Sequence, residues 1–233
     1  MKPWLLCTIC IATLVGGDLW AAGGQGSRRR GHANPEAASR DAAVRPVYFV
    51  PIGDMPASLI DTLIVHCRQK LSLSVDTLPR LGSDRVWIDP GRNQIVAERV
   101  IASLRQRYPR HARNDAVVIG ITTADMYIAR VPWRFAFGYR PGGDSGRRVA
   151  VISTARMTPE FYNHHRNDSL VIERLRKMVV RYLGVLYYQL PFNNDRESVL
   201  YKDLLGLDEL DTMGEVLPFG PRLAAPPPAV RRP

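Results

Sequence analysis

The residues best suited to bind a metal or to activate a water molecule form one small group, His164, His165 and Asp168, just before a long predicted helix. Imidazole nitrogens and carboxylate oxygens are zinc ligands, and a histidine can also act as a general base. Tetrahedral zinc needs three or four converging ligands, however, and two adjacent histidines face one site only where the backbone bends sharply. We therefore expect surface histidines here, with a hydrolase that uses this group as an alternative.

A glycine-rich stretch at residues 142–146 contains Ser145, the other candidate for chemistry. It lacks the nucleophile elbow of serine hydrolases. It also lacks the Lys-Ser/Thr pair and the helix that follow a phosphate-binding loop. The stretch is more typical of a hairpin turn, and we expect no catalytic serine in it.

The elements that must position these residues alternate along the chain. Apolar, β-branched runs predict strands at residues 47–52, 74–78 and 115–122. Helical spacing of apolar residues predicts helices at 56–71, 94–108 and about 169–188. Residues 135–139 and 147–153 flank the glycine-rich stretch and predict a hairpin. This order predicts an α/β (α+β) fold with a mixed sheet.

Apolar side chains recur along one side of the long helix. A core face explains them without any catalytic role, and apolar groups there would stabilise the fold by about 1–3 kcal/mol each. Cys67 lies in a similar apolar stretch and is expected to be buried. The predicted core face of the long helix consists of Leu175, Met178, Val179, Tyr182, Leu183, Leu186 and Tyr187.

Residues 1–22 have the three parts of a secretory signal peptide: Lys2, an apolar run over residues 4–15, and small residues at 21–24. The run is shorter than the roughly 20 residues that a transmembrane helix needs. We expect a secreted or periplasmic protein, with an uncleaved N-terminal anchor as the alternative.

The formal net charge of +10 is concentrated toward the ends of the chain. Residues 23–45 carry five arginines against two acidic residues and are predicted to be a basic flexible linker. Residues 221–233 form a tail rich in proline and arginine, and the folded domain is expected at 46–220. The ends suit an anionic envelope surface. No aromatic–basic interleaving accompanies the charge, so no specific nucleic-acid partner is expected.

Several fixed spacings in the chain resemble the archaemetzincins, small metallopeptidases of the zincin fold. The first block is a T-x-x-D-hydrophobic-Y turn at residues 122–127, an F-x-F-G strand at 135–138 and a V-x-S-x-x-R strand end at 151–156. The second is Glu173-Arg174 with Lys177 and Gly184 on the long helix. The resemblance covers about residues 47–215. It implies a zincin-like mixed sheet with an edge hairpin and an active-site helix at about 169–188.

In that family the helix carries the motif H-E-x-G-H, in which two histidines one turn apart bind zinc and the glutamate acts as general base. In this chain Arg181, Tyr182 and Val185 stand at those three positions, and Pro191 stands at the third ligand. Arginine has no free acceptor for a metal and valine has no donor atom. The resemblance implies zinc as the cofactor, but the residues at these positions predict no metal and no cofactor.

The family's second zinc site uses cysteines, and Phe192 and Glu197 fall where the first two are expected. We therefore predict an exported, catalytically inactive pseudopeptidase that binds extended peptide or protein. The resemblance implies that the edge hairpin pairs with the bound chain. Two alternatives remain open, an active hydrolase with another site and a basic envelope-binding module. The candidate binding residues are Arg134, Phe135, Phe137, Tyr139 and Arg140.

Overall fold

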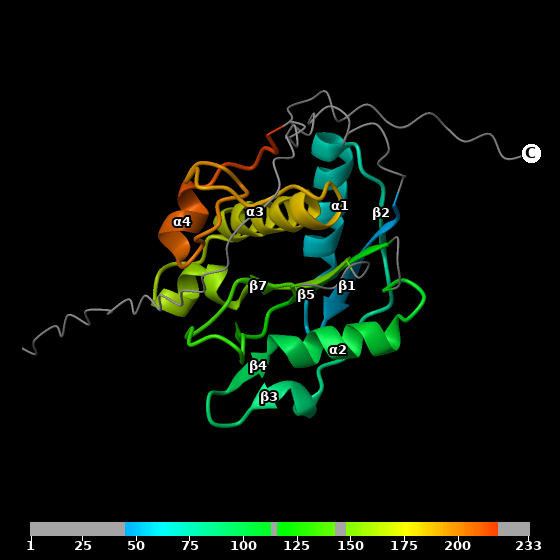
Figure 1. Ribbon diagram of the computed structural model, residues 1–233. Helices are drawn as coiled ribbons and strands as arrows, with labels where there is room; N and C mark the ends of the chain where they lie inside the picture. The colour runs from blue at the N-terminus through cyan, green and yellow to red at the C-terminus, as the bar shows by residue number, and fades with distance from the viewer. Residues whose placement is uncertain (1–44, 113–115, 143–147, 219–233) are drawn as a thin grey trace, which may run out of the picture. The chain divides into compact units, whose positions relative to one another are not determined.

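The computed structural model describes residues 45–112, 116–142 and 148–218 (Figure 1). The predicted signal peptide, most of the linker, the tail and Ser145 lie outside the described residues. Within the described part of the chain, no helix is long and apolar enough to span a membrane.

The main sheet has five strands in the order β2-β1-β5-β8-β7. Its first four strands are parallel, and β7 pairs antiparallel with β8 at the edge, as the predicted hairpin requires. All six residues of β5 are buried, which explains the continuous apolar run in the sequence, because a central parallel strand is covered on both faces. The strands are β1 Val47–Ile52, β2 Val75–Thr77, β5 Val117–Thr122, β7 Gly138–Tyr139 and β8 Arg148–Ser153.

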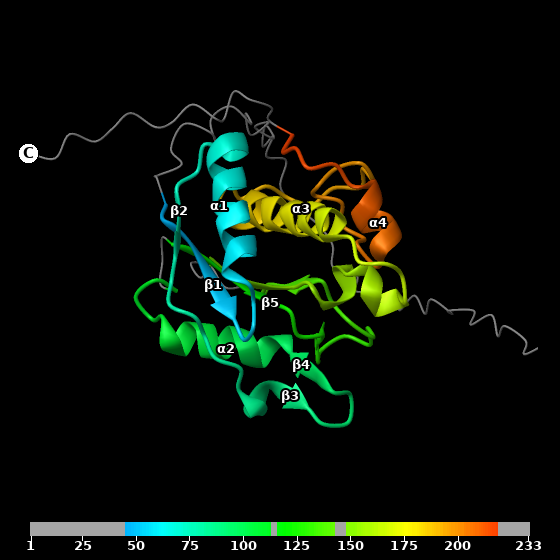
Figure 2. The same cartoon turned by 180° about the vertical axis from the view of Figure 1, so that it is seen from behind.

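Helices cover both faces of this sheet. One face packs against α1 (Ala57–Leu71) and α3 (Asp168–Leu186), and the opposite face packs against α2 (Ala97–Arg107). Figures 1 and 2 show α2 on the side of the sheet opposite to α1 and α3. A short helix, α4 (Leu207–Thr212), lies beside α3. Short 3-10 helices occupy Arg85–Trp87, Ala155–Met157 and Pro159–Tyr162.

A small second sheet, not predicted from the sequence, joins β3 (Ile88–Asp89), β4 (Gln94–Val96) and β6 (Met126–Tyr127). It corrects one expectation, because residues 94–96 were predicted to start a helix. Gln94 is buried, and its side-chain amide donates to the Asp125 carboxylate at 2.9 Å. A partner 31 residues away thus outweighs the local helical pattern.

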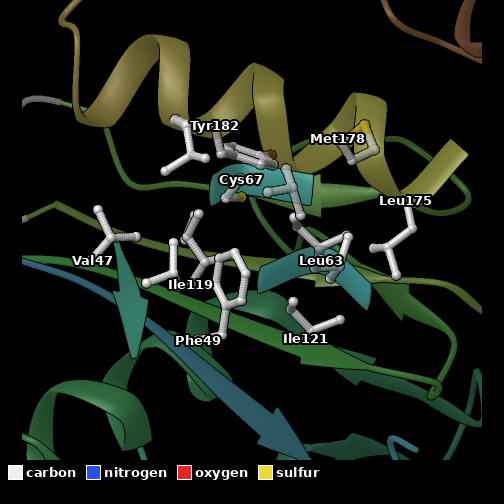
Figure 3. Close-up of a cluster of buried hydrophobic side chains, with 14 of the residues drawn as sticks. Val47, Phe49, Leu63, Cys67, Ile119, Ile121, Leu175, Met178 and Tyr182 are labelled. Carbon is white, nitrogen blue, oxygen red and sulfur yellow. The ribbon is translucent and has the colours of Figure 1, made fainter. Parts of the chain in front are cut away.

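The core face predicted for the long helix is confirmed. All seven of its residues are buried, and so is Cys67 on α1. Figure 3 shows Leu175, Met178 and Tyr182 pointing from α3 toward the sheet. Phe49, Ile119 and Ile121 meet them from β1 and β5. The helix begins where the Asn167 side chain accepts a hydrogen bond from the Leu170 amide, one residue before the predicted start. The predicted fold class is also confirmed.

Candidate functional site

A groove of about 590 Å³ lies between the hairpin and the segment 192–205, against the middle of α3. We call it the hairpin groove. Three separate segments line it: residues 128–142, α3 and residues 192–205. The lining residues are Ile128, Trp133, Arg134, Phe135, Ala136, Phe137, Gly138, Tyr139, Arg140, Gly142, Met178, Arg181, Tyr182, Phe192, Lys202, Leu204 and Leu205.

All five predicted binding residues line this groove. Phe137 is buried in the core, and Phe135 packs edge-on against it with ring centroids 5.2 Å apart. Arg134 is exposed, whereas Tyr139 and Arg140 are half-buried. The structure therefore brings together the residues selected from the hairpin, although their binding role stays a prediction.

The motif residues of the first block anchor the base of the hairpin. Arg156 makes a two-pronged ion pair with Asp125, at 2.9 Å from Nε and 2.8 Å from Nη2. This hydrogen bonding raises the pKa of Arg156 above its usual range. The Arg156 guanidinium also lies 4.6 Å from the centre of the Phe135 ring. Gln94 bonds both the Asp125 carboxylate and the Arg134 carbonyl. These contacts fix the wall of the groove.

Tyr182, where the resemblance implies the general base, turns its ring into the core and against the hairpin. A Cβ on Gly138 would lie 2.6 Å from the Cε2 and Oη atoms of Tyr182. Only a glycine therefore allows this close approach of ring and strand. Burial raises the pKa of Tyr182 to about 12, although the cations Arg181 and Arg140 act in the opposite direction. The side chain is a neutral packing group at pH 7, not a base.

Arg181, where the resemblance implies the first zinc-binding histidine, is only 5% exposed. Its Nη1 donates to the Val199 carbonyl at 3.0 Å and lies 3.8 Å from the Met213 sulfur. Its guanidinium carbon is 4.4 Å from the centre of the Phe192 ring. Burial lowers the pKa of Arg181; the Tyr182 hydroxyl opposes this shift and Arg140 adds to it. Arg181 thus connects α3 to the C-terminal segment.

The residues at the implied metal positions do not fit zinc. Val185 is half-buried against an apolar cluster around Leu200 and Leu217, and Pro191 is exposed beyond the end of α3. Neither side chain has a donor atom, and the Arg181 guanidinium offers only N–H groups. Among the described residues, no group of three or more His, Cys, Asp or Glu side chains converges. We therefore derive no zinc-dependent step from this site.

His164 and His165 lie on the exposed loop before α3 and do not line the hairpin groove. Asp168 is exposed too, and its Oδ1 accepts from Arg166 Nε at 2.8 Å. This hydrogen bond lowers the pKa of Asp168 below its usual range. Both histidines have the surface position that we expected of them.

Sequence reasoning missed the polar contacts that Arg174, Lys177 and Arg181 of α3 make with the C-terminal segment, the part of the chain that follows α3. We call these contacts the clamp. Arg174 binds both carboxylate oxygens of Asp211, at 2.7 and 2.6 Å, and the Met157 carbonyl at 2.6 Å. Lys177 Nζ donates to the Asp211 carbonyl at 3.0 Å. Arg174, Lys177 and Arg181 are all at most 6% exposed. Their i, i+3, i+7 spacing on one helix face was a signal for a shared partner.

Sequence reasoning also did not select four of the groove residues, Lys202, Leu204, Leu205 and Trp133. It noted Phe192 only as a position where the family has a cysteine. Residues 192–205 reach the hairpin through the folding of α3 and the C-terminal segment. No local pattern in this segment predicts that contact, because it carries no regular periodicity that would set its path.

Comparisons with known proteins agree on one fold. No family model matches the chain. The archaemetzincin of Thermococcus kodakarensis is 29% identical over 153 residues, which cover 62% of this chain and 76% of that protein. The archaemetzincin of Pyrococcus horikoshii is 32% identical over 99 residues, 42% of this chain and 49% of that protein.

Solved structures extend the match over most of the described residues. The crystal structure of a zinc-dependent peptidase from Methanocorpusculum labreanum superposes with a TM-score of 0.61 at 23% identity, covering 73% of this chain and 94% of that one. The archaemetzincin of Methanopyrus kandleri gives a TM-score of 0.56 at 23% identity, covering 76% of this chain and 89% of that one. With these relatives, this chain shares the archaemetzincin-like metallopeptidase fold.

Proposed function

We propose that the chain is an exported pseudopeptidase that binds extended peptides in the hairpin groove and does not hydrolyse them by zinc chemistry. The observation that carries the proposal is the buried Arg181, which stands at the position of a zinc ligand and gives its hydrogen bond to the Val199 carbonyl. A guanidinium held there brings a fixed positive charge to the place where a metal cation would have to bind.

The peptide-binding half of the proposal rests on the edge of the sheet. Ser153 N–H donates to the Phe137 carbonyl, and Gly138 lies opposite Ile152. In this antiparallel register, the N–H and C=O of Gly138 point away from β8. Gly138 lines the hairpin groove. An extended peptide can therefore add to β7 as a further strand, with these backbone groups as its first partners.

The rim of the groove favours such a ligand. Trp133, Phe192 and Leu205 are 46%, 37% and 63% exposed although they are large and apolar. A gathering of exposed apolar side chains next to an edge strand is typical of an interaction site. The solved relative from Methanocorpusculum labreanum is described as a zinc-dependent peptidase. We transfer from it the peptide as ligand class, but not the metal.

Zinc content and peptide cleavage test the inactive half of the proposal. The purified protein is dialysed against zinc, freed of excess metal and analysed for bound metal, with the archaemetzincin of Thermococcus kodakarensis treated in parallel. We expect substoichiometric zinc in this chain and no cleavage of a peptide library. One zinc ion bound per chain, or cleavage abolished by a chelator, would overturn the proposal.

Backbone-modified peptides test the binding half. A screen of a peptide library by tryptophan fluorescence, to which the exposed Trp133 contributes, identifies binders. Each binder is resynthesised with single N-methyl groups along its backbone. Strand addition predicts that methylation at alternate positions abolishes binding, because only every second N–H faces β7. Binding that tolerates every N-methyl group would rule out pairing with β7.

A further inference from the structure

The hairpin groove has an unbalanced charge. Four of its lining residues are cations: Arg134, Arg140, Arg181 and Lys202. None of the lining residues given by the described part of the chain is an aspartate or a glutamate. The other walls are apolar or aromatic. Cations in an apolar surrounding attract an anion more strongly than cations in open solvent do.

Arg181 is the centre of this imbalance. Its hydrogen-bonding partners, the Val199 carbonyl and the Met213 sulfur, are both neutral. In residues 45–112, 116–142 and 148–218, no ion pair joins it to a carboxylate. A buried charge without a counter-charge is costly, so an anion entering the groove would relieve that cost.

Arg140 approaches the same aromatic ring, Phe192, from the hairpin. The guanidinium carbons of Arg181 and Arg140 lie 4.4 and 5.5 Å from the centre of one ring, Phe192. The Arg140 Nε is buried and has no hydrogen-bond partner among the described residues. Two guanidinium groups near one aromatic ring place two positive charges in the same part of the groove, which suits a carboxylate. Lys202 stands apart from them, exposed and 4.0 Å from Asp203.

The charge also indicates what the occupant is. The tail of this chain carries Arg222, Arg231 and Arg232 and no acidic residue after Glu215, so its side chains repel the groove. A second copy of the chain is strongly basic as well. A peptide that brings an acidic side chain between apolar neighbours complements both the cations and the exposed Trp133 and Leu205.

We propose that the hairpin groove recognises an acidic side chain of an extended peptide, with Arg140 and Arg181 as its ligands and apolar neighbours against Trp133 and Leu205. This inference rests on the proposed function, because it names the ligand class of the same groove. It adds a specificity that strand addition alone does not supply, since backbone pairing is indifferent to side-chain charge.

Peptide pairs that differ in one group test the proposal. Two labelled heptapeptides, identical and apolar except for a central Glu or Gln, are titrated with the full chain by fluorescence anisotropy. We expect the Glu peptide to bind about tenfold more tightly, which corresponds to about 1.4 kcal/mol. Arg140→Gln and Arg181→Met should each abolish this preference. Arg68→Gln, a change to an exposed arginine on α1 outside the groove, is the matched control and should keep it.

The outcomes separate the two proposals. Equal binding of the Glu and Gln peptides would overturn the acidic specificity and leave peptide binding standing. Binding of neither peptide would defeat both. If Arg181→Met fails to fold by circular dichroism, Arg140→Gln decides, because Arg140 is only half-buried at the hairpin. Glutarate tested as a competitor distinguishes a free small carboxylate: if it binds as tightly as the Glu peptide, the peptide assignment is wrong.

Discussion

Arg181 holds the C-terminal segment against α3 through the Val199 carbonyl, at the helix position where the resemblance to archaemetzincins implies a zinc ligand. A metal ion and a guanidinium share one property, a positive charge that attracts the oxygen atoms of a neighbouring loop. The metal also polarises water, which a guanidinium with a pKa far above 7 does not do. In the proposed pseudopeptidase, this exchange keeps a contact between two segments without a metal-activated water.

The contact between Tyr182 and Gly138 gives a prediction at the same scale. Gly138→Ala should lower the free energy of unfolding by about 1–3 kcal/mol, because its Cβ would lie 2.6 Å from two atoms of the Tyr182 side chain. Tyr182→Leu removes those atoms, so Gly138→Ala should cost much less in that background. Urea titration of the four proteins gives the coupling. Additive effects would show that the ring is not what excludes the methyl group.

Two buried groups, Cys67 and Tyr182, and the half-buried Tyr188 predict alkaline unfolding. Burial raises the pKa of Cys67 from 9.0, and those of Tyr182 and Tyr188 from 10.0, in each case to about 12. Above pH 9 the unfolded chain loses the thiol proton while the folded chain keeps it. The free energy of unfolding therefore falls as the pH rises from about 9 toward 12, by up to about 1.4 kcal/mol per pH unit for each group.

Cys67→Ala separates the thiol from the two phenols. Without the thiol, the fall should begin near pH 10 and not near pH 9, because the tyrosines then start it. Urea titrations from pH 8 to 11 measure the slope, which the smaller side chain does not affect even if it lowers the whole curve. An unchanged slope between pH 9 and 10 would contradict a buried, protonated thiol.

At the scale of elements, α3 is both a core helix and a clamp. One of its sides packs on the sheet, while Arg174 and Lys177 reach the segment that contains α4. Arg174 satisfies the Met157 carbonyl and both oxygens of Asp211 at once. A further ion pair, between Arg176 and Glu215 at 2.7 Å, adds to this docking. These contacts position residues 192–205 along the hairpin groove.

Arg174→Ala should therefore destabilise the protein by about 2 kcal/mol, because it leaves the buried Met157 carbonyl unpaired and removes a charged hydrogen bond. Part of the pair is solvent-screened, since the Asp211 side chain is 43% exposed. Arg166→Ala is the matched control: its pair with Asp168 is exposed on both sides, and no measurable change is expected. Equal losses in the two variants would contradict the role of burial.

Elements that depend on local patterns could be predicted from the sequence, whereas positions fixed by contacts between residues far apart in the chain could not. The spacing of Leu175, Met178 and Leu186 predicted the core face of α3, and apolar runs predicted β1 and β5. These predictions were possible because burial on a regular element follows a local period. Gln94 was misassigned because its partner is Asp125 in a distant turn. The groove wall at Phe192 had no local signal either. Its place depends on Arg181, 11 residues earlier and in another element.

At the scale of the whole molecule, the cations belong to two groups, those of the hairpin groove and those of the terminal segments. The cations of the hairpin groove sit on described elements, at defined distances from Phe192. Residues 23–45 and 221–233 carry five arginines and three arginines respectively, and of these only Arg45 lies in the described part of the chain, where it donates to the Tyr187 carbonyl. A selective site and a general attraction to anions are then separate properties, and they should respond differently to salt and to truncation.

Deletion of residues 23–44 and 221–233 distinguishes these properties and keeps Arg45, which donates to the Tyr187 carbonyl. The truncated protein should bind the Glu peptide as tightly as the full chain, because all lining residues of the groove remain. The truncated protein should no longer sediment with vesicles of phosphatidylglycerol and phosphatidylcholine. The full chain should bind these vesicles at low salt. It should release them as the screening length falls from about 30 Å at 0.01 M salt to about 3 Å at 1 M. If the truncated protein sediments as the full chain does, the basic ends are linkers and the envelope-binding role is wrong. If it loses the peptide instead, the groove extends beyond residues 128–205.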